Sequence, residues 1–488
     1  MKITVIGCGY LGAVHAATLA SLGHHVTGID VDARKIDHLS RGFSPFFEPG
    51  LEELLHAGRR EGTLKFTALY EGIDDADVHF LCVGTPQSKT DDRADLAHLM
   101  AAAGALAPHL RPGAVVAGKS TVPVGTTAKL ADLFAGTGVE LALNPEFLRQ
   151  GTAVKDSLAP DRLVYGVAEG AGGQRAVDVL DGVYAPLLAA GTPRLVTSPA
   201  TAELIKSSAN AFLALKLSYI NALAELCDAT GADVEELAQA MGLDERIGAT
   251  YLGAGVGFGG GCLPKDLRSF RAQAQELGVD SVAGLMALAD GINTDARHRT
   301  VEAARRLCGG VLGGRRITVL GAAFKPGTDD IRDSPALDIA SRLAARGADV
   351  VVTDPRAINN AWLQYPQLCF EPNTMAALNG AELVLLLTEW NEYLRLDPAS
   401  VAAVVSRTVL LDGRNALDGG TWRAAGWDYR GIGRGAWAPD AGAAPASARA
   451  MAPAAANGPL AATPAHAAAP QAAPKPAGPR TAGAGSPL

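Results

Sequence analysis

The chain has 488 residues, of which 48% are hydrophobic and 19% are charged, and its formal net charge at pH 7 is -8. This length exceeds what one hydrophobic core serves, so we expect two or three domains of an ordinary soluble globular protein. The acidic balance, without a polybasic stretch, argues against a nucleic-acid-binding protein and against binding to a membrane surface.

The cysteines and histidines show no spacing typical of a disulfide framework or a metal site, so we predict neither. Residues 1–20 superficially resemble a signal peptide, but three glycines and His15 interrupt the apolar stretch. No run approaches the ~20 apolar residues that a membrane-spanning helix needs. We therefore expect a cytoplasmic protein.

The first part of the chain alternates short β-branched runs with helical patterns. We predict strands at Lys2–Ile6, His25–Ile29, Val78–Val83, Ala114–Ala117 and Glu140–Leu143. Helical patterns lie between them at Ala13–Leu22, Leu51–Ala57 and Leu96–Leu106. Such alternation indicates βαβ units and a parallel sheet.

Near Pro199 the alternation of strands and helices gives way to helical patterns alone. A long helix is predicted at Thr201–Thr230, followed by helices at Asp233–Met241, Leu267–Leu277 and Val282–Leu307. From Arg315 the βαβ pattern returns, with strands at Ile317–Leu320, Val350–Thr353, Leu383–Leu387 and Thr408–Leu411 and a helix at Ala336–Ala345.

We therefore predict an α/β fold in which two Rossmann-like, doubly wound domains are joined by a central helical region that contains a long helix. The expected boundaries are 1–198, 199–310 and 311–434. Residues 435–488 are rich in Ala, Pro and Gly with almost no charge, so we expect a disordered tail.

A glycine motif, Gly7-Cys8-Gly9-Tyr10-Leu11-Gly12, follows the first strand and precedes a helix. Asp30 ends the second strand about twenty residues later. This context predicts a dinucleotide, with its pyrophosphate at the helix N-terminus and Asp30 at the adenosine ribose hydroxyls. A carboxylate there repels a 2′-phosphate and favours NAD over NADP. The alternative is a tight turn without a ligand.

Polar residues follow three later strands, at the edge of a parallel sheet where ligands bind. Thr85 and Thr121 are possible cofactor contacts, although ordinary turn chemistry also explains these segments. Glu146 could act as an acid or base, and a solvent-exposed carboxylate is the alternative. On the long helix, Lys206 and Asn210 lie four residues apart and could stabilise an oxyanion, unless Lys206 only extends to solvent.

The segment from Gly257 to Asp266 places a cysteine, a lysine and an aspartate behind a run of glycines. If a helix begins here, Cys262 and Asp266 lie on one face. A partly exposed thiol beside Lys265 occupies the kind of electropositive setting that favours a thiolate. The alternative is a turn with a packed, unreactive thiol.

Together these motifs resemble, in kind and in order, those of the nucleotide-sugar 6-dehydrogenases, the UDP-glucose/GDP-mannose dehydrogenase family. The resemblance covers roughly residues 1–430 and adds Glu203–Phe212, Asp244–Gly248, Ala323–Lys325 and Asp412–Arg414. It implies the oxidation of the C6 alcohol of UDP-glucose to a carboxylate with two NAD molecules. It also implies an N-terminal NAD-binding domain, a central dimerisation domain and a C-terminal UDP-sugar-binding domain.

The resemblance implies roles for individual residues. Cys262 would form a thiohemiacetal and then a thioester, Lys206 and Asn210 would stabilise alkoxide and oxyanion charge, Asp266 would orient or deprotonate water, and Glu146 would assist thioester hydrolysis. The implied cofactor-binding residues are Gly7, Gly9, Tyr10, Leu11, Gly12, Asp30, Lys35, Thr85, Thr121, Gln150, Lys265 and Arg332. The implied substrate-binding residues are Glu146, Phe147, Leu148, Lys206, Asn210, Arg246, Tyr251, Gly259, Phe324, Lys325 and Arg414. Arg246 would reach the substrate of a neighbouring subunit, so a homodimer or larger homo-oligomer is implied.

Three positions depart from the family pattern. Gln150 stands where Glu is usual; it keeps the hydrogen-bonding reach and loses the charge, which puts any acid–base role of that position in doubt. Gly261 replaces a common Ser, and Leu263 replaces a frequent aromatic residue. Neither of these two changes removes a reacting group.

Three other functions are alternatives to the oxidation of UDP-glucose. GDP-mannose 6-dehydrogenases share the cysteine and the lysines. The sequence from Asp244 to Leu252, however, resembles the enzymes that act on UDP-sugars. UDP-N-acetylmannosamine dehydrogenases usually lack the Asn-Pro-Glu-Phe motif, which this chain has at residues 144–147, so this function is less favoured. A non-catalytic NAD-binding sensor or scaffold would keep the fold without the chemistry, and the joint presence of Cys262, Lys206, Asn210 and Asp266 argues against it.

Overall fold

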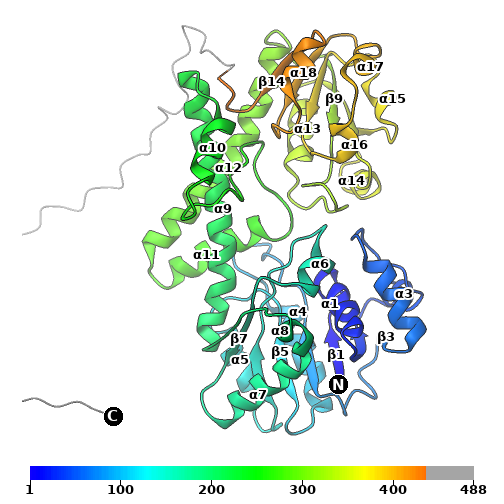
Figure 1. Cartoon of the computed structure of the whole chain (residues 1–488), viewed down its shortest axis with the longest axis vertical. Helices are drawn as coiled ribbons and strands as arrows, with labels where there is room; N and C mark the ends of the chain where they lie inside the picture. The colour runs from blue at the N-terminus through cyan, green and yellow to red at the C-terminus, as the bar shows by residue number, and fades with distance from the viewer. Residues whose placement is uncertain (436–488) are drawn as a thin grey trace, which may run out of the picture. The chain divides into compact units, whose positions relative to one another are not determined.

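A computed structural model describes residues 1–435 of the chain (Figure 1). Apart from Gly435, the tail that we expect to be disordered lies outside these described residues. No helix within residues 1–435 combines the length and apolar content needed to cross a membrane.

The N-terminal region contains an eight-stranded sheet in the order β3-β2-β1-β4-β5-β6-β7-β8. Its strands are β1 (Lys2–Ile6), β2 (His25–Ile29), β3 (Leu64–Thr67), β4 (Val78–Leu81), β5 (Val115–Gly118), β6 (Glu140–Leu143), β7 (Leu163–Val167) and β8 (Arg194–Thr197). The helices are α1 (Tyr10–Ser21), α2 (Ala33–Ser40), α3 (Leu51–Glu61), α4 (Ala97–Leu106), the short 3-10 helix η1 (Ala107–His109), α5 (Thr126–Leu133), α6 (Ala153–Leu158), α7 (Ala171–Val183) and α8 (Ala185–Ala189).

Helices cover both faces of this sheet because its central strands are apolar on both sides; every residue of β4 and β5 is buried. Side chains of α1 and α7 fill one core, and side chains of α4 and α5 fill the other. The five predicted strands are confirmed, with end shifts of one or two residues. β3, β7 and β8 were not predicted.

One strand pairing departs from the predicted parallel sheet. β7 runs antiparallel to β6, with Leu143 opposite Gly166, and β8 then pairs parallel to β7. The start of β7 therefore lies at the same edge of the sheet as the ends of β1, β4, β5 and β6. Arg162, directly before β7, is brought to that edge.

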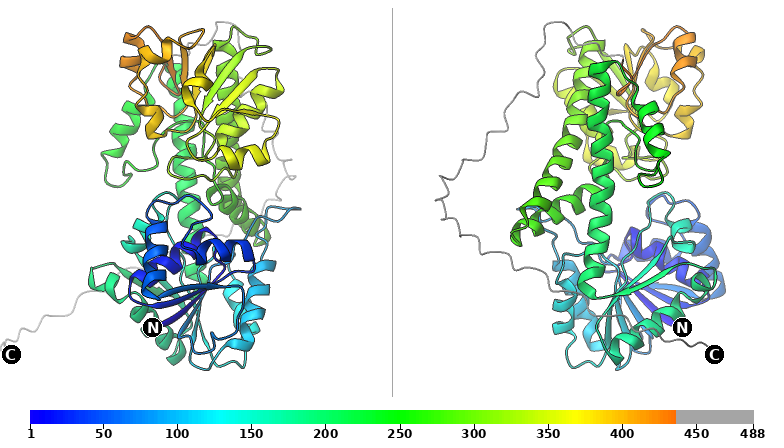
Figure 2. Two further views of the ribbon diagram at one scale, coloured as in Figure 1. Left: turned by 90° about the vertical axis from the view of Figure 1, so that its right-hand side faces the viewer. Right: turned by 60° about the vertical axis from the view of Figure 1, so that its left-hand side comes forward.

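The central region consists of α9 (Pro199–Thr230), α10 (Val234–Gly242), α11 (Leu263–Glu276) and α12 (Asp280–Leu307). The long helix is capped at its N-terminus by Ser198, whose hydroxyl accepts from Thr201 N at 3.3 Å, and at its C-terminus by Gly231, which has φ +78°. α9, α11 and α12 pack on one another (Figure 2), with Ala211, Ala214 and Phe258 in the shared core. The four predicted helices are confirmed, with end shifts of up to four residues.

The C-terminal region has a six-stranded, all-parallel sheet in the order β11-β10-β9-β12-β13-β14. Its strands are β9 (Arg316–Leu320), β10 (Asp349–Thr353), β11 (Cys369–Phe370), β12 (Leu383–Leu386), β13 (Val409–Asp412) and β14 (Asp428–Gly431). Its helices are α13 (Pro335–Ala345), α14 (Ile358–Gln364), α15 (Thr374–Leu378), α16 (Asn391–Leu394), α17 (Pro398–Ala402) and α18 (Gly419–Ala424). Both sheets reverse strand order beside their first strand, which confirms the doubly wound class.

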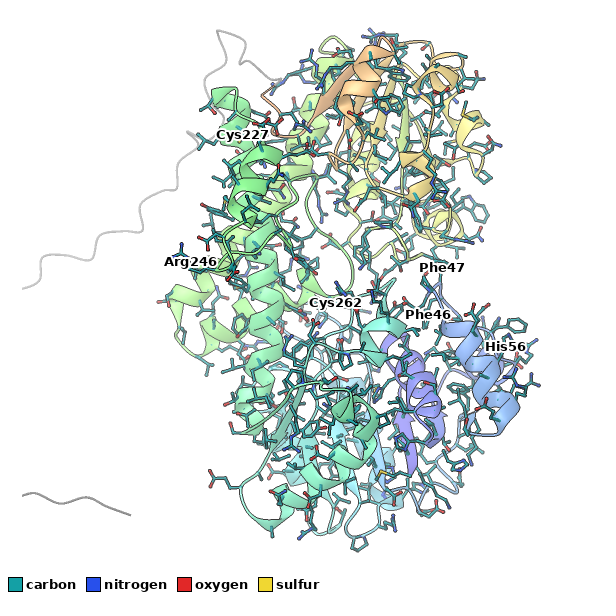
Figure 3. All side chains as sticks on the ribbon, in the orientation of Figure 1. Phe46, Phe47, His56, Cys227, Arg246 and Cys262 are labelled. Atoms are coloured by element: carbon teal, nitrogen blue, oxygen red, sulfur yellow. The ribbon has the colours of Figure 1, made fainter. Side chains whose placement is uncertain are left out.

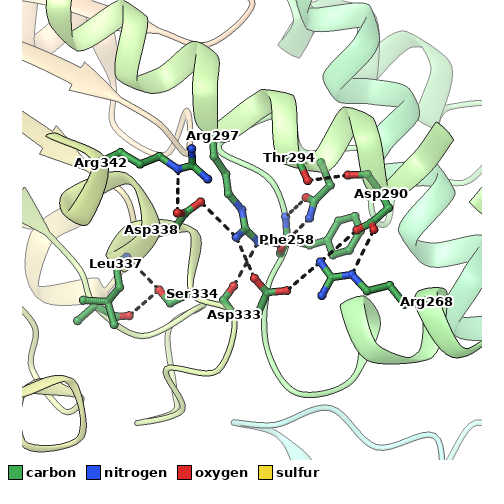
Figure 4. A network of polar contacts seen from close by, with 12 residues as sticks. Phe258, Arg268, Asp290, Thr294, Arg297, Asp333, Ser334, Leu337, Asp338 and Arg342 are labelled. Atoms are coloured by element: carbon green, nitrogen blue, oxygen red, sulfur yellow. Dashed lines mark hydrogen bonds and ion pairs between the residues drawn. The ribbon is translucent and has the colours of Figure 1, made fainter. Parts of the chain in front are cut away.

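A buried arginine joins the central helices to the loop before α13. Arg297 of α12 donates to the carbonyl of Phe258 at 3.0 Å, and its Nη1 lies 2.8 Å from Asp333 Oδ1 and 3.5 Å from Asp338 Oδ2 (Figure 4). Asn293 binds both the N–H and the carbonyl of Phe258. The glycine-rich segment that contains Phe258 is therefore fixed from two sides.

We predict that Arg297→Ala lowers the free energy of unfolding by about 3–5 kcal/mol, because it removes a buried guanidinium that pairs with both Asp333 and Asp338. The measurement is the urea midpoint followed by circular dichroism. Arg342→Ala is the matched control, since Arg342 is more exposed than Arg297, at 38% against 9%, and loss of its pair with Asp338 should cost at most about 1 kcal/mol. Equal midpoints for the two variants would contradict the prediction.

Candidate active site

The glycine motif after β1 forms an open turn at the N-terminus of α1. Gly7 has φ +89°, and a Cβ on Gly12 would lie 1.8 Å from the carbonyl oxygen of Gly7, so both positions require glycine. The Cβ position of Gly9 instead faces open space, with no heavy atom within 4 Å. No side chain caps α1, so its first N–H groups are available to a diphosphate.

Asp30 lies at the end of β2, beside this turn. Its carboxylate accepts from Cys8 N at 2.8 Å and from Asp32 N at 3.0 Å, and it forms an ion pair with Lys35 at 2.8 Å. Asp30 and Lys35, both implied for the cofactor, are therefore bound to each other in the ligand-free chain. A dinucleotide would share Asp30 with Lys35.

Two hydrogen bonds join the turns after β4 and β5. The hydroxyl of Thr85 donates to the carbonyl of Thr121 at 2.7 Å, and the hydroxyl of Ser120 donates to the carbonyl of Val83 at 2.6 Å. Thr121 and Lys265 both line a small cavity between the turn after β5 and α11. The structure thus brings these two implied cofactor contacts together, although they are 144 positions apart in the sequence.

A buried ion pair links the turn after β6 to α9. Lys206 Nζ lies 3.1 Å from Glu146 Oε1, and the other oxygen of Glu146 accepts from Leu148 N at 2.7 Å. Desolvation opposes the charge on Lys206, but Glu146, Cys262 and Asp266 outweigh it and raise the pKa of Lys206. The ammonium therefore stays charged, and the alternative of a lysine that only extends to solvent is wrong.

A second polar cluster joins α9 to α11. Asn210 Nδ2 donates to Asp266 Oδ2 at 2.7 Å, and Lys265 Nζ lies 2.6 Å from Asp266 Oδ1. Asp266 is almost fully buried, and each of its oxygens has a donor. The carboxylate is thereby held in a fixed position between α9 and α11.

Cys262 occupies the N-cap position of α11, and Asp266 N donates to its carbonyl at 2.8 Å. The cysteine and Asp266 therefore share the first turn of α11, as predicted. One side of Cys262 is open to solvent. Figure 3 places Cys262 at the meeting point of the central helices and the N-terminal region.

The prediction that this setting favours a thiolate is wrong for the ligand-free chain. The protein atoms around the sulfur desolvate it and raise the pKa of Cys262, and the carboxylates of Asp266 and Glu146 add to the rise. Lys206 and Lys265 lower the pKa by less than these effects raise it. The thiol is therefore neutral near pH 7.

The glycines before Cys262 allow a close approach of the loop at 330–334. A Cβ on Gly259 would lie 2.2 Å from the carbonyl oxygen of Asp333, and a Cβ on Gly261 would lie 2.2 Å from the Arg332 guanidinium carbon. Gly260 N donates to the carbonyl of Arg332 at 2.8 Å. The serine common at position 261 in the family would not fit this arrangement unless Arg332 moved.

Arg332 and Gln150, both implied for the cofactor, share one carboxylate. Arg332 Nε lies 3.0 Å from both oxygens of Asp330, and Gln150 Nε2 donates to Asp330 Oδ2 at 3.0 Å. A glutamate at position 150 would face Asp330 with like charge. Glutamine therefore suits this partner, which gives the departure at Gln150 a physical reason.

Two implied substrate residues of the C-terminal region, Phe324 and Arg414, also contact the glycine-rich segment. The ring of Phe324 lies against Gly260, and Lys325 Nζ lies 5.6 Å from the centroid of that ring. Arg414 donates to the carbonyls of Leu387, Gly257 and Phe324 at 2.7, 3.2 and 3.2 Å. Arg414 thus holds three loops together.

Two implied residues of the central region differ in their placement. Tyr251 has φ +67° and interacts electrostatically with Lys206 and Cys262. Arg246 is 88% exposed, binds Asp244 at 2.6 Å, and lies away from Cys262 (Figure 3). The single chain therefore does not bring Arg246 to the site.

Sequence reasoning missed Glu48, which is 5% exposed and organises the segment between β6 and α6. It accepts from Gly151 N and Ala153 N, both at 2.7 Å, and is hydrogen-bonded to Tyr10. The hydroxyl of Tyr10, an implied cofactor residue, is therefore directed at Glu48. The available signal was a carboxylate inside the apolar Pro45–Pro49 segment.

Lys119 was also missed. It follows β5, is 6% exposed, and its ammonium lies 5.9 Å from the Phe80 ring centroid and 5.7 Å from the Tyr184 ring centroid. Burial lowers the pKa of Lys119 to about 8. Among residues 1–435, the structure records no ion pair for this lysine.

Three family models match the chain in order. The NAD binding domain of the UDP-glucose/GDP-mannose dehydrogenase family matches residues 1–188, its central domain matches residues 200–295, and its UDP binding domain matches residues 318–419. The chain belongs to this family.

Similar proteins span nearly the whole described chain. UDP-glucose 6-dehydrogenase YwqF of Bacillus subtilis is 39% identical over 446 residues, which cover 90% of this chain and 99% of that protein. A UDP-glucose 6-dehydrogenase of Pseudomonas aeruginosa is 38% identical over 463 residues, covering 92% of this chain and 100% of that protein. The solved structure of a UDP-glucose dehydrogenase from Pyrobaculum islandicum has a TM-score of 0.80 and 37% identity, and the match covers 88% of this chain and 97% of that one.

We predict that Lys119→Met stabilises the fold at pH 7 by about 1–3 kcal/mol, because it removes a buried unpaired charge. Between about pH 8 and 10.5 the unfolded chain binds a proton that the folded chain has released, so wild-type stability rises with pH. The advantage of the variant should therefore shrink across that range. Urea midpoints measured from pH 7 to 10 check this, with the exposed Lys129→Met as the control. A variant less stable than wild type at pH 7 would refute the prediction.

Proposed function

We propose that this chain catalyses the NAD-dependent, two-step oxidation of UDP-glucose to UDP-glucuronate through covalent intermediates on Cys262. The observation that carries the proposal is the position of Cys262 beside the Lys206–Glu146 pair and the Asn210–Asp266–Lys265 cluster. The family's NAD binding and UDP binding domains and the names of its 35–39% identical relatives support the same activity.

The residues present fit NAD. The turn at Gly9 is open above the uncapped N-terminus of α1, where a pyrophosphate would bind, and Asp30 stands at the end of the next strand, where it would bind ribose hydroxyls. When bound, NAD supplies the hydride acceptor for both oxidations. Thr121 and Lys265 line the cavity next to Asp266, and Gln150 and Arg332 both bind Asp330.

A cysteine is needed because two hydrides must leave the same carbon. The Cys262 thiol adds across the C6 aldehyde, so that sulfur bonds to carbon, the thiol proton passes to oxygen, and a tetrahedral C–H is restored. Lys206 and Asn210 would donate to the oxygen while it carries negative charge. Since both side chains are buried and anchored by carboxylates, they are oriented before the charge develops.

The second oxidation leaves a thioester on Cys262, and water must break it. Attack of water on C6 expels the sulfur and releases a carboxylate, and the proton from water passes to a nearby base. Asp266, fixed by two donors, would orient this water, and Glu146 would assist. The raised pKa of Cys262 favours the return of the neutral thiol at the end of the cycle.

The alternatives have less support. A GDP-mannose 6-dehydrogenase would have the same cysteine chemistry, but the UDP binding domain model and the relatives favour the uridine nucleotide. A sensor without catalysis does not require the buried, paired set of Lys206, Asn210 and Asp266 around a cysteine. Steady-state rates with UDP-glucose and GDP-mannose separate these cases, and faster turnover of GDP-mannose would overturn the substrate assignment.

We also propose domain boundaries at 1–198, 199–310 and 311–434, which enclose the three matched family domains. Within this scheme the central domain forms a homodimer. Phe212, Tyr219 and Leu226 are spaced by seven residues on α9 and are 54–62% exposed, so they form an apolar stripe along one helix face. A second copy that covers this stripe could also supply Arg246 to a neighbouring site.

We predict that the wild type forms two NADH per UDP-glucose, read as absorbance at 340 nm. Cys262→Ser should form at most one NADH per sugar and slow steady-state turnover by at least about 100-fold, because a hydroxyl is a far weaker nucleophile than a thiol. Cys369→Ser changes another exposed cysteine, in β11, and is the matched control that should keep full activity. Unchanged turnover in Cys262→Ser would rule out the thioester route.

We further predict that the double variant Phe212→Glu/Tyr219→Glu is monomeric by size-exclusion chromatography with light scattering, because like charges would face each other across the stripe. Its activity should fall with dimer content, since Arg246 would no longer reach a neighbouring site. Leu363→Glu on α14, another exposed apolar position, should leave the oligomer intact. A wild-type monomer with full activity would contradict the proposed dimer.

A further inference from the structure

Arg162 lies at the ligand-binding edge of the N-terminal sheet only because β7 runs antiparallel to β6. Its guanidinium carbon lies 3.8 Å from the centroid of the Phe147 ring. Among residues 1–435, the structure records no ion pair or hydrogen bond from this guanidinium, so the aromatic ring is its recorded partner. No recorded ion pair therefore accounts for the position of the guanidinium over the ring.

Phe147 links this arginine to the catalytic lysine. Lys206 Nζ lies 5.4 Å from the centroid of the same ring and 3.1 Å from Glu146, the residue directly before Phe147. Glu146 is also bound to Leu148 N at 2.7 Å, so the backbone on both sides of Phe147 is held in a tight turn. The ring orientation is thus coupled to the position of the Lys206–Glu146 pair.

We propose that Arg162 is a positioning residue, whose stack on Phe147 fixes the ring and thereby holds the Lys206–Glu146 pair in its working geometry. This inference rests on the proposed function for its kinetic consequence, though not for the contact itself. In this role Arg162 acts through Phe147 and does not itself contact substrate or cofactor.

The geometry requires arginine rather than any cation. A guanidinium at 3.8 Å lies flat enough to cover a ring face, whereas the ammonium of lysine is a point charge on a flexible stem. Without the planar group, the ring gains freedom to rotate, and Lys206 then meets a ring edge or open space in place of a fixed face. The Lys206–Glu146 distance, and with it the stabilisation of the oxyanion, would vary.

The kinetic test uses full-length protein with UDP-glucose and NAD. Arg162→Lys and Arg162→Ala should each lower kcat by about 3- to 30-fold and change the KM for UDP-glucose by less than about 3-fold, because the pair acts on the developing charge. In a Phe147→Leu background, Arg162→Lys should have no further effect, since its partner is gone. Arg423→Lys, which changes another arginine stacked on an aromatic ring, 5.0 Å from Tyr429, should leave kcat unchanged.

A second measurement needs no substrate. In protein labelled with 4-fluorophenylalanine, the ¹⁹F resonance that disappears in Phe147→Leu reports on this ring. We expect Arg162→Lys to shift that resonance while the thermal midpoint stays within about 2 °C of wild type. This readout separates loss of the stack from general destabilisation.

Three outcomes would overturn the inference: wild-type kcat in Arg162→Lys, a full effect of Arg162→Lys in the Phe147→Leu background, or an unmoved ¹⁹F resonance. Failure of the proposed function looks different, because the wild type itself would then not oxidise UDP-glucose. In that case the ¹⁹F measurement alone decides whether Arg162 holds the ring.

Discussion

The position of the Cys262 thiol depends on one close approach between two backbones. The segment Gly257–Gly261 lies so near the loop at 330–334 that any side chain at Gly259 would overlap the carbonyl of Asp333. Arg297 and Asn293 bind the same segment from α12. Because Cys262 follows directly and caps α11, this docking fixes where α11 starts. It thereby fixes which of its first-turn side chains face α9.

The polar groups of the site are already bound to one another in the ligand-free chain. Asp30 holds Lys35, Asp266 holds Asn210 and Lys265, and Asp330 holds Arg332. Binding a dinucleotide and a sugar nucleotide therefore exchanges hydrogen bonds, and each exchange contributes little net free energy. The benefit is orientation: groups that must stabilise charge in the transition state need little rearrangement when it forms.

Much of this site was predictable from the sequence, because its residues follow recognisable strand ends. The glycine turn, Asp30 and the pairing of Cys262 with Asp266 on one helical turn depend on local spacing, and local spacing can be read directly. The neutral state of the Cys262 thiol could not be predicted, because it depends on desolvation and on carboxylates 116 positions before it and four after it. Glu48 and Lys119 were missed for the same reason: each is a charged residue whose partners are distant in sequence.

The strand reversal at β7 explains how α9, a helix outside the sheet, brings Lys206 and Asn210 to the ligand-binding edge. Because β8 runs parallel to β7, it ends at the edge opposite the ligand-binding edge, and α9 begins there with Pro199 against Gly166. α9 then crosses the sheet face, packing Ala202 and Ile205 into the core. The seven residue steps of α9 from Pro199 to Lys206 rise ~10 Å along the helix axis. This is close to the ~13 Å that β7 spans in the opposite direction. Lys206 therefore arrives at the ligand-binding edge beside Glu146, and Asn210 follows one turn later toward α11. In an all-parallel sheet, α9 would start at the ligand-binding edge, and these two residues would have no route back to it.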